Sequence, residues 1–443
     1  MNSPYSVTSP KIDPSRGAPA CKPDGSPNDE DRVEIGPTDK AFEEWAALGI
    51  TPPNLQHMRE TRLERVCGEL RKRDYAGALV FDPLNIRYIT DSSNMHLWIA
   101  HNPARAAFVS TDGYIILWEF HHCEHLSSYL PLVREVRYDA AIFYFLAGDK
   151  EEKIAHNFAQ EIDAILREHC GTNRRLAVDK MEVAGIQALQ KLGVDIKSGQ
   201  QVLEHARLVK GVDEINAMRC AMATCEIAMQ EMHKAIQPGI AEVELWSVLH
   251  AENIKRGGEW IETRILSSGP RTNPWMQEAG PRRLRAGELL AYDTDLIGPY
   301  GMCSDLSRTV LIGDDRPSVE QRDIYRIAYE HIMTNIELLK PGVGFRELTE
   351  RGHRLPEEYR EQRYGVMMHG VGLCDEFPAI YYPEDFIDGA FDYVLEPGMT
   401  ICVEVYAGAV GGKDGVKLED QVLITEDGHE NLTKFSFDER LLA

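Results

Sequence analysis

Hydrophobic and polar positions follow two different periods in the first half of the chain. A helical period covers residues 55–73, and a short continuous apolar run at 76–82 indicates a buried strand. Two further apolar runs, at 106–110 and 113–120, flank a Thr-Asp-Gly turn and predict a pair of neighbouring strands. Helices and strands alternate in this way up to about residue 200, which predicts an α/β domain.

The second half of the chain has a different order of elements. A long helical stretch at 215–236 ends at a Gln-Pro-Gly sequence. The further elements predicted are helices at 241–256 and 318–339 and strands near 261–268, 289–297, 306–312, 364–369, 400–407 and 416–425. Helices that come first and strands that cluster later are typical of an α+β domain with a curved, mostly antiparallel sheet. We therefore predict an α+β protein.

The chain of 443 residues is too long for one typical core and is expected to contain more than one domain. Its first 40 residues are rich in Pro, Ser, Asp and Gly and have little periodic apolar content. We predict three parts: an extended N-terminal arm at 1–45, an N-terminal domain at 46–205, and a C-terminal domain at 206–443 that carries the chemistry.

Composition excludes several classes of protein. A formal net charge of −23 disfavours nucleic acid as a partner, because binding to phosphates depends on clustered Lys and Arg. The nine cysteines form no CxxC pair, which indicates neither a disulfide framework nor a zinc knuckle and fits a reducing cytoplasm. The N-terminus does not resemble a signal peptide, and no apolar run is long enough to span a membrane. We predict a cytoplasmic protein without a membrane partner.

Acidic side chains and one histidine recur in the strand-like runs of the C-terminal half. Asp293 and Asp295 are two positions apart in one predicted strand, so both should point to the same face of the sheet. One acid in a strand is more often a surface residue or a salt-bridge partner, but six such residues in order point to a site. The candidate metal ligands are Asp293, Asp295, Asp305, His369, Glu404 and Glu419. Five carboxylates and one imidazole suit two hard to borderline ions such as Mn, Fe, Co or Zn.

Four motifs make the chain similar to the creatinase, prolidase and methionine aminopeptidase group, whose catalytic domain has the "pita-bread" fold. They are SDLSRT at 304–309, HGVGL at 369–373, EPGM at 396–399 before Glu404, and KLEDQVLITEDG at 417–428. NIRYIT at 85–90 and ARLVK at 206–210 extend the resemblance to a creatinase-like N-terminal domain.

The resemblance implies metal ligands at Asp305, His369, Glu404 and Glu419. The family's first aspartate falls on Thr294, which lies between Asp293 and Asp295, so we expect both of these flanking acids to bind metal.

Two departures from the family pattern bear on function. Peptidases of the group carry a histidine after a proline some twenty residues before the first ligand, and here Trp275 follows Pro274. A second family histidine, six positions after the metal-binding one, is replaced by Asp375. Without these imidazoles the handling of a scissile peptide is compromised, so we expect a reaction other than peptide hydrolysis.

Within the group, this combination resembles the metal-dependent dimethylsulfoniopropionate lyases. The resemblance implies β-elimination to dimethyl sulfide and acrylate, with Asp375 as the general base, a metal-bound substrate carboxylate, and iron as the favoured metal. A sulfonium cation cannot form hydrogen bonds and is best held against aromatic faces. The aromatic residues that we expect to bind the substrate are Tyr364, Trp275, Trp98, Phe108 and Tyr300.

The resemblance also implies a homodimer, because in creatinase-like relatives the N-terminal domain of one subunit closes over the partner's active site. Two alternatives remain open on the sequence. One is a dinuclear metallohydrolase of the aminopeptidase, prolidase or amidinohydrolase type, and the other is a catalytically inactive binding protein of the same fold. The retention of all six candidate ligands argues against the second.

Overall fold

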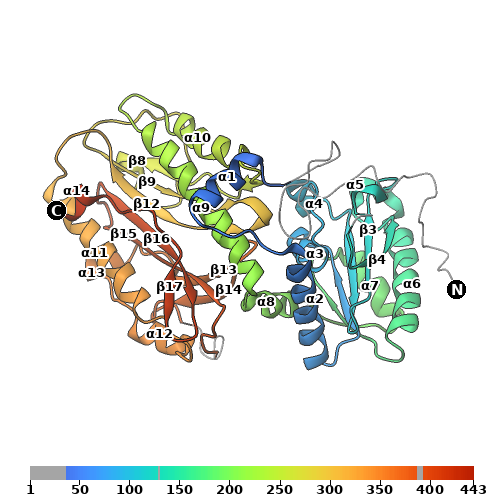
Figure 1. Cartoon of the computed structure of the whole chain (residues 1–443). Coiled ribbons are helices and arrows are strands. Elements are labelled where there is room, and N and C mark those ends of the chain that lie inside the picture. The colour runs from blue at the N-terminus through green and yellow to red at the C-terminus, as the bar shows by residue number, and fades with distance from the viewer. Residues whose placement is uncertain (1–35, 128–129, 387–392) are drawn as a thin grey trace. The chain divides into compact units, whose positions relative to one another are not determined.

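The computed structural model describes residues 36–127, 130–386 and 393–443 and divides the chain into two compact units (Figure 1). Unit 1 contains Asn54–Arg207, and unit 2 contains Gly36–Pro53 and Leu208–Ala443. The predicted arm at 1–45 lies mostly outside the described residues. Most of its described part lies in the helix α1 (Asp39–Ala47), which groups with unit 2, as do residues 46–53, which we had assigned to the N-terminal domain.

Unit 1 is built on a six-stranded mixed sheet with the order β4-β3-β2-β1-β5-β6. Its strands are β1 (Gly77–Val80), β2 (Ala106–Ser110), β3 (Ile115–Glu119), β4 (Val133–Tyr138), β5 (Arg175–Val178) and β6 (Asp195–Ser198). Its helices are α2 (Leu55–Lys72), α3 (Pro83–Thr90), α4 (His96–His101), α5 (Tyr144–Ala147), α6 (Glu151–His169), α7 (Val183–Lys191) and α8 (Gly199–Leu208). The alternation of helices and strands agrees with the α/β domain predicted from the sequence.

The main helices of unit 2 begin and end at recognisable signals. α9 (Val212–Lys234) stops just before Pro238, and α11 (Val319–Ile336) starts with a capping box formed by Ser318 and Gln321. The other helices are α10 (Glu242–Ile254), α12 (Phe345–Arg351), α13 (Glu357–Arg360) and α14 (Glu439–Leu442). α11 packs on β15 and β16, and its buried residues join the largest core of the unit.

The sheets of unit 2 are antiparallel throughout. The largest has five strands in the order β14-β13-β15-β16-β17. Its strands are β13 (Val366–Val371), β14 (Asp375–Tyr381), β15 (Thr400–Gly408), β16 (Gly415–Ile424) and β17 (His429–Asn431). Two three-stranded sheets contain β7 (Trp260–Ile261), β8 (Leu266–Ser268), β9 (Leu289–Asp293), β10 (Leu296–Ile297), β11 (Cys303–Ser304) and β12 (Ser307–Leu311). The predicted α+β class is confirmed.

Every residue of β15 and β16 is buried, although both strands carry a carboxylate. Their apolar side chains, such as Val403, Val405 and Leu418, belong to the core beside α11. Because side chains alternate along a strand, Glu404 and Glu419 point to the opposite face, away from this core. The sheet therefore offers one face to the core and the other to a polar site.

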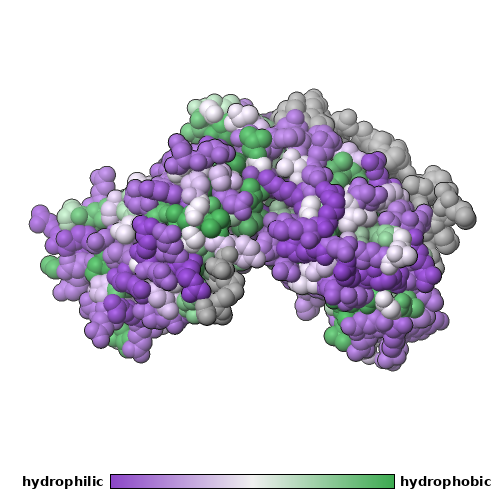
Figure 2. All heavy atoms as spheres, turned by 90° about the horizontal axis from the view of Figure 1, so that it is seen from below, coloured by the Kyte–Doolittle hydropathy of each residue, from purple (hydrophilic) through white to green (hydrophobic). Residues whose placement is uncertain are grey.

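No helix in the described part of the chain combines the length and apolarity needed to cross a membrane. The face drawn in Figure 2 is mostly hydrophilic, with hydrophobic side chains gathered in small separate groups. An acidic net charge of −23 agrees with this hydrophilic surface.

Candidate functional site

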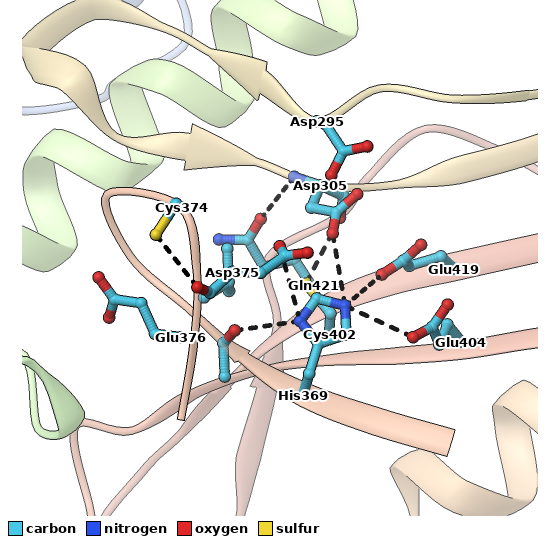
Figure 3. Close-up of polar contacts among 12 residues, drawn as sticks. Asp295, Asp305, His369, Cys374, Asp375, Glu376, Cys402, Glu404, Glu419 and Gln421 are labelled. Atoms are coloured by element: carbon cyan, nitrogen blue, oxygen red, sulfur yellow. Dashed lines mark hydrogen bonds and ion pairs between the residues drawn. The ribbon is translucent and has the colours of Figure 1, made fainter. Parts of the chain in front are cut away.

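The six candidate ligands predicted from the sequence come together in unit 2. Asp293 ends β9, Asp295 and Asp305 lie in the connections that follow β9 and β11, and His369, Glu404 and Glu419 lie on β13, β15 and β16. Figure 3 shows Asp295, Asp305, His369, Glu404 and Glu419 together in the site. Two groups of ligand atoms lie close enough to hold a metal ion, all within 4.8 Å of one another in each group. The first group is Asp305, His369, Cys402 and Glu419, and the second is Asp293, Asp295 and Asp305. Glu404 lies directly opposite Glu419 in the β15–β16 register and joins the first group through His369, with 3.6 Å from its Oε1 to the imidazole Nε2.

The Asp293 and Asp295 pair reaches the site by a different route from the one predicted. The strand expected at 289–297 is interrupted, since β9 ends at Asp293, and Asp295 has a φ of +33°, in the left-handed region. Thr294 fills the break: its hydroxyl donates to the Ser304 carbonyl at 2.8 Å and accepts from the Leu306 amide at 3.0 Å. The alternation of side chains along a strand therefore does not explain why Asp293 and Asp295 lie close together. The two hydrogen bonds of Thr294 stabilise the backbone where the strand is interrupted.

His369 is held in the tautomer that a metal ligand needs. Its Nδ1 lies 3.0 Å from the Gly370 carbonyl oxygen, which can only accept, so Nδ1 carries the proton. Its Nε2 faces three carboxylates, at 3.2 Å from Glu419, 3.5 Å from Asp305 and 3.6 Å from Glu404. A backbone acceptor on one ring nitrogen commonly orients the other toward a metal.

Lys417 is a member of the site that the analysis of the sequence missed. Its Nζ lies 2.9 Å from Asp293, 3.0 Å from Glu404 and 2.6 Å from Glu419, and also 2.9 Å from the Ser307 hydroxyl. An ammonium group has three protons to donate, so these four oxygen atoms use all of them. The signal was present in the sequence, because residues 417 and 419 on one strand must point to the same face.

Crowding of buried carboxylates shifts their pKa values. Burial and the neighbouring acids raise the pKa of Asp295 and Asp305 well above the usual range. Burial raises the pKa of Glu404 to about 8, against the opposing charge of Lys417. Burial alone would also raise the pKa of Glu419, but Lys417 and His369 outweigh it and lower that pKa. The positively charged groups of the protein are thus too few to balance the negative charge of all these carboxylates.

Two buried oxygen atoms of this cluster are suited to bind a cation. Within the described residues, Asp305 Oδ1 and Glu404 Oε1 have no hydrogen-bond partner. A buried carboxylate oxygen without a partner is costly unless it coordinates a cation. Together with the imidazole Nε2 and the other carboxylates, these atoms fit one or more metal ions with a preference for oxygen and nitrogen ligands.

Two fully buried cysteines, Cys402 and Cys303, lie next to each other at the edge of the ligand cluster. Cys303 packs with Val371 and Cys402 in a small buried apolar cluster. The Cys402 thiol lies among the atoms of the first ligand group, but it donates to the Asp305 backbone carbonyl at 3.7 Å. That contact accounts for the orientation of the Cys402 thiol without a role as a metal ligand.

Asp375 lies at the mouth of the site. Its Oδ1 is 3.7 Å from His369 Nδ1, and 55% of its side chain is exposed. Desolvation by the surrounding protein raises the pKa of Asp375, His369 opposes this rise and Glu419 adds to it. A carboxylate with a raised pKa and access to the pocket is suited to accept a proton.

Two of the five predicted aromatic residues lie beside the cluster. The rings of Trp275 and Tyr364 each have their centroid 5.8 Å from Lys417 Nζ. Trp275 also stacks on Tyr406, with centroids 5.8 Å apart. Burial raises the pKa of Tyr364, so its hydroxyl keeps its proton. The site therefore has an aromatic side facing its carboxylates.

The other three aromatic residues have different surroundings. Phe108 has an exposed fraction of 0% in the core of unit 1, so the prediction that it binds substrate is wrong: its ring fills the space beside β1. Trp98, also in unit 1, packs on Phe120 and Phe143. The Tyr300 ring stacks on Trp45 of α1, with centroids 5.8 Å apart, which is a packing role.

Comparisons with known proteins agree with this arrangement. The family described as "Metallopeptidase family M24" matches residues 216–426, and the "Creatinase/Prolidase N-terminal domain" matches residues 62–209. The curated dimethylsulfoniopropionate lyase DddP of Roseovarius nubinhibens is 53% identical over 448 aligned residues that cover 100% of both chains. The protein of the same name from Roseobacter denitrificans is 51% identical over the same length.

Solved structures of lower identity share the fold. An Xaa-Pro dipeptidase from Bacillus anthracis superposes with a TM-score of 0.67 at 22% identity, over 85% of this chain and 98% of that one. An X-Pro aminopeptidase from Thermotoga maritima gives a TM-score of 0.68 at 19% identity, over 85% and 98% of the two chains. At these identities the likeness concerns the fold alone.

Proposed function

The chain belongs to the family of the dimethylsulfoniopropionate lyases, within the M24 and creatinase fold group, and we propose that it cleaves dimethylsulfoniopropionate to dimethyl sulfide and acrylate. The observation that carries this function is the carboxylate of Asp375 beside the metal-ligand cluster, 3.7 Å from His369. A base at the mouth of a cationic centre serves proton abstraction from carbon, which a β-elimination requires and peptide hydrolysis does not.

Asp375 acts as the general base in this reaction. Its carboxylate takes the proton from the carbon α to the substrate carboxylate, and the electrons of that C–H bond form the α–β double bond. The bond between the β carbon and sulfur breaks, and its electron pair leaves on sulfur. Because the Asp375 side chain is 55% exposed, it returns the proton to solvent, so the products are acrylate, dimethyl sulfide and one proton.

Trp275 and Tyr364 hold the sulfonium end of the substrate. The support is their position: both rings lie 5.8 Å from the ammonium of Lys417, so their faces already border a cation. Aromatic faces attract cations that cannot form hydrogen bonds. The neutral leaving group, dimethyl sulfide, lacks this attraction and departs more easily.

The metal is held by the six residues predicted from the sequence. We assign Asp305, His369, Glu404 and Glu419 to one ion and Asp293, Asp295 and Asp305 to a second. The unpartnered oxygen atoms of Asp305 and Glu404 support this assignment, and the resemblance to the lyases favours iron over manganese, cobalt or zinc. A bound ion supplies Lewis-acid stabilisation of the negative charge that develops on the substrate carboxylate.

We also propose a cytoplasmic homodimer. Two short helices of unit 1, α4 and α5, and the residue before α4 carry large hydrophobic side chains with exposed fractions of 55–73%, and exposed apolar side chains that gather on a surface are typical of an interface. They are Met95, Leu97, Tyr144, Phe145 and Leu146. The eight cysteines of the described residues are unpaired, which supports a reducing compartment.

Incubation of the purified, metal-loaded protein with dimethylsulfoniopropionate tests this function. We expect dimethyl sulfide in the headspace and an equal amount of acrylate in solution, measured by gas and liquid chromatography. An Xaa-Pro dipeptide incubated in parallel should stay intact. Dipeptide hydrolysis without dimethyl sulfide would favour the metallohydrolase, and a folded but metal-free protein would favour the inactive binding protein.

A further inference from the structure

We propose that a buried ion pair between Lys210 and Glu376 is the device that positions Asp375 for proton abstraction. This inference rests on the proposed function, because it concerns the same base. Lys210 Nζ lies 3.1 Å from Glu376 Oε2, and only 3% and 1% of the two side chains are exposed. Both residues belong to unit 2, and neither is among the candidate metal ligands.

Glu376 reaches back under the turn that leads into Asp375. Its Oε1 accepts a hydrogen bond from the Leu373 amide at 2.9 Å, while its Oε2 faces Lys210. One carboxylate oxygen of Glu376 thus binds the turn, and the other binds Lys210. The ion pair fixes Glu376, and Glu376 fixes the turn at residues 372–374.

The turn has little freedom to take another conformation. Its Gly372 has no space for a larger side chain, because a Cβ there would lie 2.4 Å from the Glu376 carboxylate. The Gly372 amide donates to the Cys374 carbonyl at 2.9 Å, and its carbonyl accepts from the Cys303 amide at 2.8 Å. The Glu376 carboxylate therefore occupies the interior of a closed turn.

The direction of Asp375 follows from the direction of Glu376. Consecutive side chains of a strand point to opposite faces, and both residues lie at the start of β14. In the β13–β14 register, Asp375 pairs with Val371 and Glu376 pairs with Gly370, just after a bulge at His369. In Figure 3 the Glu376 carboxylate points away from the carboxylate cluster. Pulling Glu376 toward Lys210 consequently turns Asp375 toward His369.

Lys210 is itself anchored at its backbone. Its amide donates to the Gly398 carbonyl at 2.8 Å, and the Gly398 amide donates to the Ile424 carbonyl at 2.9 Å. Gly398 has a φ of +91°, and a Cβ there would meet the Lys210 carbonyl at 2.9 Å. The backbone of Lys210 is thus held near the end of β16, in the sheet that carries His369, Glu404 and Glu419.

Glu376→Gln tests the inference with little change in shape. The amide has one donor and one acceptor end, so it must turn its NH2 group either to the Lys210 ammonium or to the Leu373 amide, and one contact becomes donor against donor. We expect kcat to fall by about tenfold or more with KM and metal content within about twofold of wild type, because small misplacements of a reacting group cost rate.

An isotope effect separates positioning from a general loss of structure. With substrate deuterated at the α carbon, we expect a larger isotope effect on kcat in Glu376→Gln than in wild type, because proton abstraction becomes slower relative to other steps. An isotope effect near unity in Glu376→Gln together with a lower kcat would mean that proton abstraction is not the step that became slower, and would overturn the proposal. So would a kcat equal to that of wild type.

Amide hydrogen exchange of the metal-loaded enzyme gives a readout that does not depend on activity. We expect faster exchange in the peptide that contains residues 372–376 in Glu376→Gln. Glu44→Gln is the matched control, since Glu44 of α1 pairs with the buried Arg256 at 2.7 Å, a pair that includes no residue of the turn, and should leave this exchange and kcat unchanged. Unchanged exchange at 372–376 in Glu376→Gln would overturn the positioning role even if the wild type lacked lyase activity.

The double variant Lys210→Met with Glu376→Gln is a control for misfolding of the single variant. It removes both charges, so no buried charge is left without a partner. We expect the same loss of kcat, the same larger isotope effect and the same faster exchange as in Glu376→Gln. A double variant with wild-type kcat would show that Asp375 needs no support from this pair and would contradict the proposal.

Discussion

The buried cluster of metal ligands and the mouth of the site differ in how much they say about the reaction. The cluster consists of carboxylates and His369 on strands of two sheets and on the connections between strands, and the fold of the chain is shared with an Xaa-Pro dipeptidase and an X-Pro aminopeptidase at 22% identity or less. The mouth consists of Trp275, Tyr364 and Asp375, and two of these residues, Trp275 and Asp375, stand where the sequence departs from the peptidase pattern. The ligand cluster therefore provides a Lewis acid, whereas the residues at the mouth determine which bond is broken.

The cluster should lose its metal when Glu419 is changed, because this carboxylate contacts both His369 and Lys417. Glu419 lies 3.2 Å from His369 and 2.6 Å from Lys417. Glu419→Gln should lower metal affinity by more than about 100-fold, since even partners outside the ligand set contribute about 10–100-fold, and lyase activity should fall to background. Metal analysis after dialysis and a dimethyl sulfide assay check both results. Full metal occupancy in this variant would show that Glu419 is not a ligand.

Lys417 should contribute most to the stability of the protein when no metal is bound. Lys417→Met leaves the adjoining carboxylates of Asp293, Glu404 and Glu419 without their ammonium, and loss of one buried partner costs about 3–5 kcal/mol. Denaturant unfolding of the metal-free variant should reveal this loss, and added metal should recover a larger share of stability than in wild type. Lys417→Arg, which keeps the charge, is the control and should lose less. Equal losses of stability with and without metal would show that the charge of Lys417 does not balance the carboxylates of the site.

Substitutions at the mouth should have smaller effects, and these effects should change substrate binding. Trp275→Leu removes one aromatic face from a cation and should raise KM for dimethylsulfoniopropionate by about 3- to 30-fold, equivalent to about 0.5–2 kcal/mol. The metal content should not change. Trp246→Leu, on α10, removes a ring of the same kind from another element and should leave KM unchanged. A drop in metal content with no change in KM would break the distinction between mouth and cluster.

The sequence predicted the cluster better than the aromatic side. Acids in apolar strands are informative, because a buried carboxylate requires a partner, and Glu404 and Glu419 meet across β15 and β16 as alternation requires. The same reasoning missed the break at Thr294, since a positive φ at Asp295 leaves no mark in a pattern of apolar residues.

Aromatic residues were the least predictable part. Phe108 and Trp275 look alike in a sequence, yet one fills the core of unit 1 and the other borders the carboxylates. Only the packing of the folded chain separates these roles, because an aromatic ring is as well suited to a core as to a binding surface. The α1 helix likewise joins unit 2 through contacts distant in sequence, which local composition at 1–45 does not indicate.

Asp375→Asn tests most directly whether the mouth, rather than the cluster, carries the proton transfer. One preparation of this variant should be measured for metal content and for dimethyl sulfide release. We predict metal content equal to that of wild type and a kcat lower by on the order of 10²–10⁴-fold, the usual contribution of a general base. A variant that keeps its metal and releases dimethyl sulfide at the wild-type rate would contradict the account.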